Sequence, residues 1–230
     1  MQPTKKILQL RQLLSERFPG TRGVSKKRDG REPVSRDTES SEVGNLLAGN
    51  LSRGEITELS CAHLSSGGAL ILGSLIRKAC ANHQWIGLID GSDCFDPTTF
   101  ENSVLSRMLW VRCAHAGQAM QAADLVLRDG NLPLVFLDLA MNSDSELRKL
   151  NASHWFRLQR LIERTPTALL VATPFALVSG AHTRFSLNTR FGIDDLTRPE
   201  NELHEQLNIK LVHRRSDRSL EYEAALLTEP

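Results

Sequence analysis

The sequence contains no apolar run near the roughly 20 residues that a membrane-spanning helix requires. Its first residues carry charge without an apolar segment behind them, so no secretory signal is expected. A chain of 230 residues, with 40% hydrophobic and 24% charged residues, suits one domain with appended termini. We therefore expect a cytoplasmic protein that makes no membrane contact.

Metal-binding and disulfide patterns are also missing. The four cysteines form no C-x-x-C pair, and the seven histidines show no H-x-x-x-H or H-E-x-x-H spacing. Reduced, buried thiols are expected, at Cys61, Cys80, Cys94 and Cys113. Aromatic residues make up only 5% of the chain. The tryptophans lie in apolar segments and are expected in the core rather than as base-stacking platforms; they are Trp85, Trp110 and Trp155.

The chain lacks an overall excess of either charge, with 28 basic and 27 acidic residues and a net +1, but the charges are unevenly spread. Residues 1–36 hold ten basic and three acidic residues, a net +7, which leaves the remainder at −6. Such a basic arm is typical of contact with nucleic acid or an acidic partner, although a solvated tail has the same composition. The candidate contact residues are Lys26, Lys27, Arg28, Arg214, Arg215 and Arg218.

The N-terminal part divides into two segments. Within residues 1–19, Ile7, Leu10, Leu14 and Phe18 recur at helical spacing and predict an amphipathic helix. Residues 20–43 are rich in Gly, Ser and charge and predict a flexible basic linker. Such a tethered helix docks either on its own domain or on a neighbouring subunit.

Residues 44–230 are expected to form the core domain. Strand-length apolar segments, "EITELS", "WIGLID", "MLWVRC", "LVFLDL" and "TALLVA", alternate with predicted helices at 69–82, 117–128 and 153–164. Gly130 is expected to end the second helix and Ser153 to cap the third. This alternation predicts an α/β fold with a mainly parallel sheet between helices. The segments "RFSLNTRF", "NIKLVHRR" and "LEYEAALL" are expected to add antiparallel strands at the C-terminal edge.

The segment "CAHLSSGGALIL", residues 61–72, has the spacing of a phosphate loop without its chemistry. In the pattern G-x-x-x-x-G-K-[ST], Ala62 replaces the first glycine, and Gly68 and Ala69 replace the lysine and the hydroxyl residue. The candidate nucleotide-binding residues are Ser65, Ser66, Gly67, Gly68 and Ala69, with Asp138 at the end of "LVFLDL". A plain strand–turn–helix is the alternative.

In their order, "GEITEL", "SSGG", "LIDGSDCFDP" and "LPLVFLDL" resemble the core of the RecA recombinase ATPases. The last of these is similar to that family's Walker B strand. The segments "SRMLWVRC", "HWFRLQRLIE" and "TPTALLV" are similar to the shortened ImuA-type RecA relatives, which accompany translesion polymerases in bacteria. The resemblance implies a RecA-like P-loop fold over most of residues 54–227.

The resemblance also shows which catalytic groups are missing. Ser92 stands where the family has a catalytic glutamate, with Asp93 one residue away, and Thr173-Pro174 stands where it has a phosphate sensor. Losing the lysine and the hydroxyl would weaken nucleotide binding by roughly 10²–10⁴-fold. We expect a degenerate ATPase without a cofactor, with magnesium ATP as the alternative. Asp90 and Asp96 suggest a metal pair, but both suit structural roles in turns.

The implied function is a non-catalytic scaffold in DNA repair, in SOS-type translesion synthesis. The implied partner is a polymerase-like translesion factor or a true recombinase, with nucleic acid contacted through that partner or through the basic arm. The N-terminal helix would allow homo-oligomers. Alternatives are a weak ATPase or nucleotide sensor and a DNA-binding protein that uses the arm. The counterparts of RecA's DNA-binding loops, 141–152 and 174–183, are short and not strongly basic.

Overall fold

The computed structural model describes residues 51–215. The predicted N-terminal helix and linker, and the segment "LEYEAALL", lie outside the described residues. Seven strands form one sheet in the order β3-β2-β4-β5-β1-β6-β7. The strands are β1 (Ile56–Cys61), β2 (Ile86–Asp90), β3 (Met108–Arg112), β4 (Leu134–Asp138), β5 (Ala168–Thr173), β6 (Thr183–Leu187) and β7 (Ile209–Arg214).

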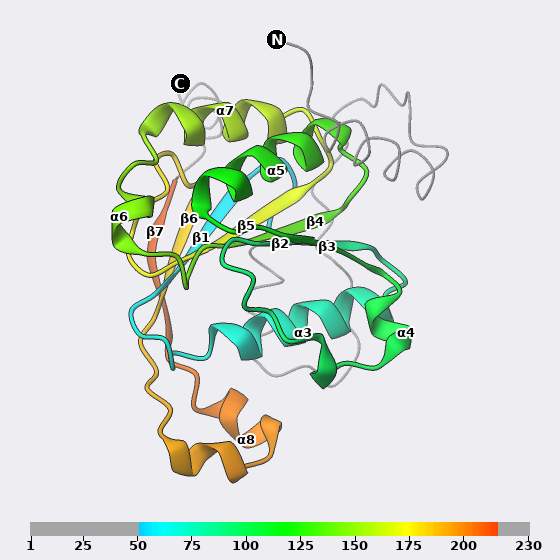
Figure 1. The fold of residues 1–230 in the computed structure, drawn as a ribbon, viewed down its shortest axis with the longest axis vertical. Coiled ribbons are helices and arrows are strands. Elements are labelled where there is room, and N and C mark those ends of the chain that lie inside the picture. The colour runs from blue at the N-terminus through cyan, green and yellow to red at the C-terminus, as the bar shows by residue number, and fades with distance from the viewer. Residues whose placement is uncertain (1–50, 216–230) are drawn as a thin grey trace, which may run out of the picture.

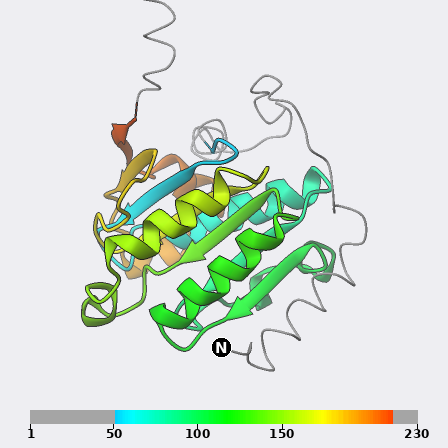
Figure 2. The same ribbon diagram turned by 90° about the horizontal axis from the view of Figure 1, so that it is seen from above.

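Helices cover both faces of this sheet (Figure 1). They are α3 (Gly68–Ala81), α4 (Asn102–Leu105), α5 (Ala116–Asp129), α6 (Asp144–Leu147), α7 (Ala152–Ile162) and α8 (Glu200–Glu205), with the 3₁₀ turns η1 (Pro97–Thr99) and η2 (Ile193–Thr197). Figure 2 shows α5 and α7 side by side over one face, while α3 lies on the other. The three long helices therefore occur where the sequence predicts them, within two residues at each end.

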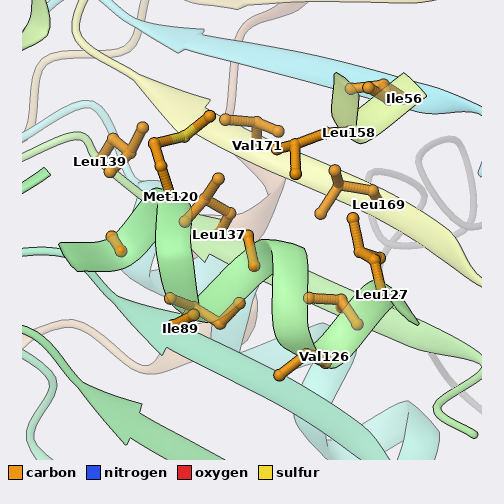
Figure 3. Close-up of a cluster of buried hydrophobic side chains, with 14 of the residues drawn as sticks. Ile56, Ile89, Met120, Val126, Leu127, Leu137, Leu139, Leu158, Leu169 and Val171 are labelled. Carbon is orange, nitrogen blue, oxygen red and sulfur yellow. The ribbon is translucent and has the colours of Figure 1, made fainter. Parts of the chain in front are cut away.

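The central strands are buried on both faces, as strands between two helical layers must be. All five residues of β2 and all six of β5 are buried. One core cluster fills the space between the sheet and the helices α5 and α7 (Figure 3). A second cluster packs α3 against the opposite face. The sheet thus forms a rigid platform, and its carboxyl edge carries the loops considered below.

Helix ends confirm one expectation and correct another. Gly130 ends α5 with φ at 68°, a left-handed conformation that glycine adopts without steric cost. Ser153 does not cap α7: the N-cap is Asn151, and the Ser153 hydroxyl donates to the Asn151 side chain instead. Asn and Ser are both favoured at the N-cap position, so the local sequence alone does not indicate which of the two begins the helix.

The C-terminal edge of the sheet differs from the expectation. Strand β6 pairs parallel to β1, and only β7, which pairs with β6, is antiparallel. The loop between β5 and β6 carries the chain back to the edge of the sheet where the parallel strands begin, so β6 runs parallel to them. The connection between β6 and β7 stays at the edge where the parallel strands end, so β7 runs in the opposite direction. The result is a mostly parallel sheet with one antiparallel pair, a Rossmann- or P-loop-like α/β fold. None of the helices between residues 51 and 215 has the length and apolar character needed to cross a membrane.

Candidate functional site

The predicted phosphate loop joins β1 to α3. Gly67 has φ at 93°, which favours glycine, and it directs the chain into the first turn of α3. A Cβ atom at Gly67 would lie 2.4 Å from Leu207 and 2.9 Å from Phe191. The loop is also tied to this C-terminal segment by a 3.0 Å hydrogen bond from the Phe191 N–H to the Ser65 carbonyl. One side of the loop is therefore covered by the chain's own C-terminal part.

Two aspartates end neighbouring strands beside this loop, since Asp90 of β2 pairs in register with Asp138 of β4. Asp90 organises the turn after β2: its carboxylate accepts the N–H groups of Cys94 at 3.1 Å and Phe95 at 2.9 Å. Asp138 accepts the N–H of Ala140 at 3.0 Å through Oδ1. Burial raises the pKa of Asp138 to about 6, with the Asp90 charge adding to the rise and the Ala140 N–H opposing it.

A pocket of about 350 Å³ lies between the loop, the turn after β2 and the end of β4. Apolar side chains dominate its lining, and among the described residues no lysine or arginine lines it. The lining residues are Cys61, His63, Leu64, Ser66, Gly68, Ala69, Leu72, Cys94, Phe95, Asp96, Thr99, Phe100, Phe136, Asp138, Ala140, Met141 and Ala172.

The candidate nucleotide-binding residues fall into two groups. Ser66, Gly68, Ala69 and Asp138 line the pocket together. Ser65 and Gly67 do not line it; their contacts are with the C-terminal segment described above. The sequence thus predicts the part of the lining that stands at a strand end, Asp138, and at the start of a helix, Gly68 and Ala69.

The residues that the resemblance places at the family's catalytic positions form contacts within the chain. Asp93 pairs with Arg112 of β3, with one contact at 2.8 Å, and neither residue lines the pocket. The Thr173 hydroxyl donates to the fully buried carboxylate of Glu58 at 3.0 Å. Ser92 donates to the sulfur of Cys94. Each of these side chains therefore has a structural contact in place of a substrate-facing position.

Asp90 and Asp96 have the structural roles expected from their turns. The Asp96 carboxylate accepts the N–H of Thr98 at 2.9 Å and its hydroxyl at 2.7 Å, and so caps η1. These bonds hold the pKa of Asp96 below its ordinary value. Over the described stretch from 51 to 215, no group of three or more His, Cys, Asp or Glu side chains is placed to hold a metal ion.

The cysteines are free thiols, but not all are buried as expected. Cys61 and Cys113 are buried, Cys80 is half-buried and Cys94 is exposed at the pocket. Burial raises the pKa of the Cys61 thiol to about 11, while the nearby Ser66 hydroxyl opposes the rise and Asp138 adds to it. Cys94 follows a strand end rather than lying within a strand, which explains its exposure.

Of the basic residues predicted for partner contact, the two that the structure describes do not line the pocket. Arg214 and Arg215 are exposed at the end of β7, and Arg214 pairs with Thr183 at the amino end of β6. The pocket lies at the carboxyl ends of the parallel strands, so these arginines are at the opposite end of the sheet. Lys26, Lys27, Arg28 and Arg218 lie outside the described residues.

The two loops that the sequence resemblance matches to RecA's DNA-binding loops contact each other. The guanidinium of Arg148, in 141–152, lies 5.5 Å from the ring centre of Phe175, in 174–183. Part of the first loop forms α6. Of the tryptophans, Trp155 is fully buried, whereas Trp110 is half-buried at edge strand β3 and packs on Phe95. Trp110 is therefore only partly the core residue that was expected.

Some residues near the loop and the pocket were not predicted from the sequence. Phe95 and Phe100 stack with ring centres 5.6 Å apart, and both line the pocket. They follow β2 in a stretch that reads as a turn, where isolated aromatic residues carry no periodic signal. Two residues that cover the loop outside the pocket lining were also missed: Phe191 ends a segment interpreted as an edge strand, and Leu207 directly precedes another. Only the three-dimensional return of the chain brings them to the loop.

Asp138 gives a prediction for stability against pH. Its folded-state pKa of about 6 exceeds the unfolded value, so the contribution of Asp138 to stability is greatest below about pH 4 and is lost as pH rises through 6. We expect Asp138→Asn to stabilise the protein at pH 7.5 by on the order of 1 kcal/mol, because the charge of a half-buried carboxylate is removed. At pH 5 the gain should shrink, since the native carboxyl is then mostly protonated.

Thermal unfolding at both pH values measures this effect. Asp96→Asn is the matched control, because bonds from Thr98 favour the ionised form of Asp96 and its replacement should not stabilise. An equal gain from both variants, or a gain independent of pH, would contradict the account.

The comparisons with known proteins add no relative. The sequence matches no protein-family model, and no curated protein matches it at a significant level.

Proposed function

We propose that this chain is a non-catalytic, RecA-like accessory protein of DNA repair, which acts through protein contacts in SOS-type translesion synthesis. The proposal follows the resemblance to RecA and to its ImuA-type relatives. Its partner would be a polymerase-like translesion factor or a true recombinase. Residues 1–19 would dock on a neighbouring copy or partner, and any contact with DNA would come through the partner or the basic arm.

The observation that carries the proposal is the exposure of large apolar side chains on the loop and on the C-terminal segment bonded to it. Leu64 of the loop is 80% exposed, and Ile193 and Leu196 of η2 are 81% and 80% exposed. The hydrogen bond from Phe191 to Ser65 joins the two segments that carry these side chains. Exposed apolar side chains gathered in one place are typical of protein-interaction sites.

The chemistry of the pocket supports a role without phosphate transfer. ATP hydrolysis needs positive charge at the outer phosphates, a magnesium ligand and a group that orients water. Gly68 and Ala69 occupy the positions of the first two groups, and Asp138 has no basic partner among the described pocket residues. A triphosphate would meet a carboxylate without a compensating cation.

A weak nucleotide sensor is the second candidate. One observation favours it: the loop, the start of α3 and Asp138 line one pocket, with β5 lying between the strands β1 and β4. Backbone N–H groups at the start of a helix attract phosphate whatever the side chains are. Magnesium ATP would then bind weakly and without hydrolysis.

The proposed function is tested by mutagenesis in the source organism after DNA damage. Deleting the coding sequence should reduce damage-induced mutations to the level of a strain without the translesion polymerase. The wild-type chain should restore them, whereas Leu64→Ser with Ile193→Ser should not. Phe156→Ser is the matched control, because Phe156 is 51% exposed on α7, on the other face of the sheet. A deletion strain with normal damage-induced mutagenesis would refute the proposal.

A further inference from the structure

The pocket beside the loop has an acidic floor that its own residues do not neutralise. The Oδ2 atom of Asp138 has no hydrogen-bond donor within the described residues, and only Oδ1 is bonded, to Ala140. Asp90 lies beside it in register on β2. In a working phosphate loop the lysine and the bound magnesium balance such a carboxylate. Here the described lining supplies no lysine or arginine in their place.

A second polar group in the pocket also lacks a partner. Ser66 lines the pocket and is only 1% exposed, and its hydroxyl makes no hydrogen bond of normal geometry among the described residues, although the Cys61 thiol lies near it. Buried hydroxyl groups are nearly always bonded, so an orphan inside a cavity indicates a ligand group or water at that place. A hydroxyl accepts a hydrogen bond as readily as it donates one.

The walls and rim of the pocket are apolar. Phe95, Phe100 and Leu72 form part of the wall, while Leu64 and Met141 line the mouth and are 80% and 49% exposed. A volume of about 350 Å³ is at the lower end for ligand sites, and it suits one long side chain with its neighbour. Exposed large apolar side chains at the mouth of a pocket are typical of protein-interaction sites, which favours a polypeptide.

The start of α3 opposes a cation at this place, because a helix N-terminus carries partial positive charge. That charge amounts to roughly half a unit, and it is smaller than the full charge of Asp138. The aspartate therefore decides the sign of the preferred ligand group. A guanidinium is better suited than an ammonium, because it is more weakly hydrated and its flat faces stack on aromatic rings.

We propose that this pocket receives a basic side chain of the protein partner, an arginine that follows an apolar residue, with the guanidinium donating to Asp138 and the apolar neighbour lying against the aromatic wall. The missing lysine of the loop is then replaced by a cation from another chain. The inference rests on the proposed function only for the source of the cation. The charge preference of the pocket is a property of this chain alone.

Other charged and titratable groups lie beside Asp138 or line the same pocket. They are Asp90 on β2, the thiols of Cys61 and Cys94, Asp96 before η1, and His63 in the loop. The thiols remain neutral between pH 5 and 7.5 because burial raises their pKa, and the low pKa of Asp96 keeps it ionised. A His63→Gln background excludes a contribution of that side chain to the measured binding. Asp138, with a pKa of about 6, loses most of its charge at pH 5.

The test measures the affinity of the full-length protein for three dipeptides by NMR or calorimetry. Acetyl-Phe-Arg-amide carries the cation, acetyl-Phe-citrulline-amide is its neutral isostere, and acetyl-Phe-Glu-amide reverses the charge. We expect citrulline to bind about tenfold more weakly than arginine, or weaker still, because a charged hydrogen bond is lost. Between pH 7.5 and 5 the arginine peptide should weaken about tenfold, as Asp138 becomes protonated.

Two variants identify the group responsible. Asp138→Asn should abolish both the preference for arginine over citrulline and the pH dependence, whereas Asp129→Asn at the end of α5 should leave both unchanged. Equal binding of arginine and citrulline, stronger binding of the glutamate peptide, or an unchanged preference in Asp138→Asn would overturn the inference. If agmatine bound as tightly as the arginine peptide, the pocket would be a site for a small guanidinium compound. That result would contradict the proposal that a protein partner supplies the cation. These outcomes are independent of the mutagenesis test in cells, so either proposal can fail alone.

Discussion

Replacing Glu58 by alanine is expected to destabilise the protein by roughly 3–5 kcal/mol, the largest single effect that the structure predicts. Glu58 lies in β1 and is 0% exposed. Its Oε1 atom accepts the Thr173 hydroxyl at 3.0 Å and the N–H groups of Leu177 at 2.6 Å and Val178 at 3.0 Å. Its Oε2 atom accepts the guanidinium of Arg184.

The size of the effect follows from what the variant leaves behind. The two N–H groups and the guanidinium would lose their acceptor in a place where water is largely excluded, and each unsatisfied buried group costs about 1–3 kcal/mol. The loop between β5 and β6 would lose its anchor at the same time. Thermal unfolding should show a Tm lower by roughly 10 °C or more.

Glu55→Ala is the matched control. Glu55 precedes β1 and pairs with His182 at 3.4 Å, and both side chains are about one-fifth exposed. A partly solvated pair contributes about 1 kcal/mol or less. Equal destabilisation by the two variants would show that the buried network does not hold the β5–β6 loop as described.

Gly91→Ala should have the second-largest effect, a loss of roughly 3 kcal/mol or more. A Cβ atom at Gly91 would lie 2.6 Å from the backbone carbonyl oxygen of Asp138, 2.4 Å from Asn142 and 2.8 Å from Leu139. The Gly91 N–H also donates to that carbonyl at 2.8 Å. A backbone atom cannot give way as a flexible side chain does, so the carboxyl ends of β2 and β4 would have to separate.

This change also tests how the pocket is built, because Asp138 stands on the strand that would move. Urea unfolding measures the stability, and the arginine dipeptide reports on the pocket in whatever fraction stays folded. Gly192→Ala is the control: its Cβ would meet only an Asp195 oxygen, at 3.8 Å. We expect that variant to remain within about 0.5 kcal/mol of wild type. A Gly91→Ala protein as stable as wild type would contradict the close approach of the two strands.

The central fold was predictable because its signals are local. Strands β2 and β5 are apolar on both faces, and the helices α3, α5 and α7 have regular periodicity ended by residues such as Gly130. The direction of β6 was not predictable, because a strand's amino acids do not record which way its neighbour runs. That direction depends on the path of the connecting loop.

The site was predictable only in part, for the same physical reason. Asp138 and the loop stand at ends of elements, and parallel strands bring those ends to one edge. The aromatic wall and the covering of the loop by Phe191 and Leu207 depend on long-range returns of the chain. The Glu58 network likewise depends on distant parts of the chain. Thr173 and Arg184 follow Glu58 by 115 and 126 positions, and no local pattern connects them.

Under the proposed function, the loop has the geometry of a phosphate loop while the site lacks the charges that hold a nucleotide. Calorimetric titration of magnesium ATP into wild type and into a Gly68→Lys, Ala69→Thr double variant tests it most directly. The Cβ at position 68 would lie 3.3 Å from the Cys61 sulfur, so a small shift accommodates the lysine.

We predict no saturation of the wild-type protein up to about 5 mM, and binding at least roughly 100-fold tighter in the double variant, because two charged contacts are restored. Wild-type binding at micromolar ATP, lost in Asp138→Ala, would contradict the account and identify the protein as a nucleotide sensor.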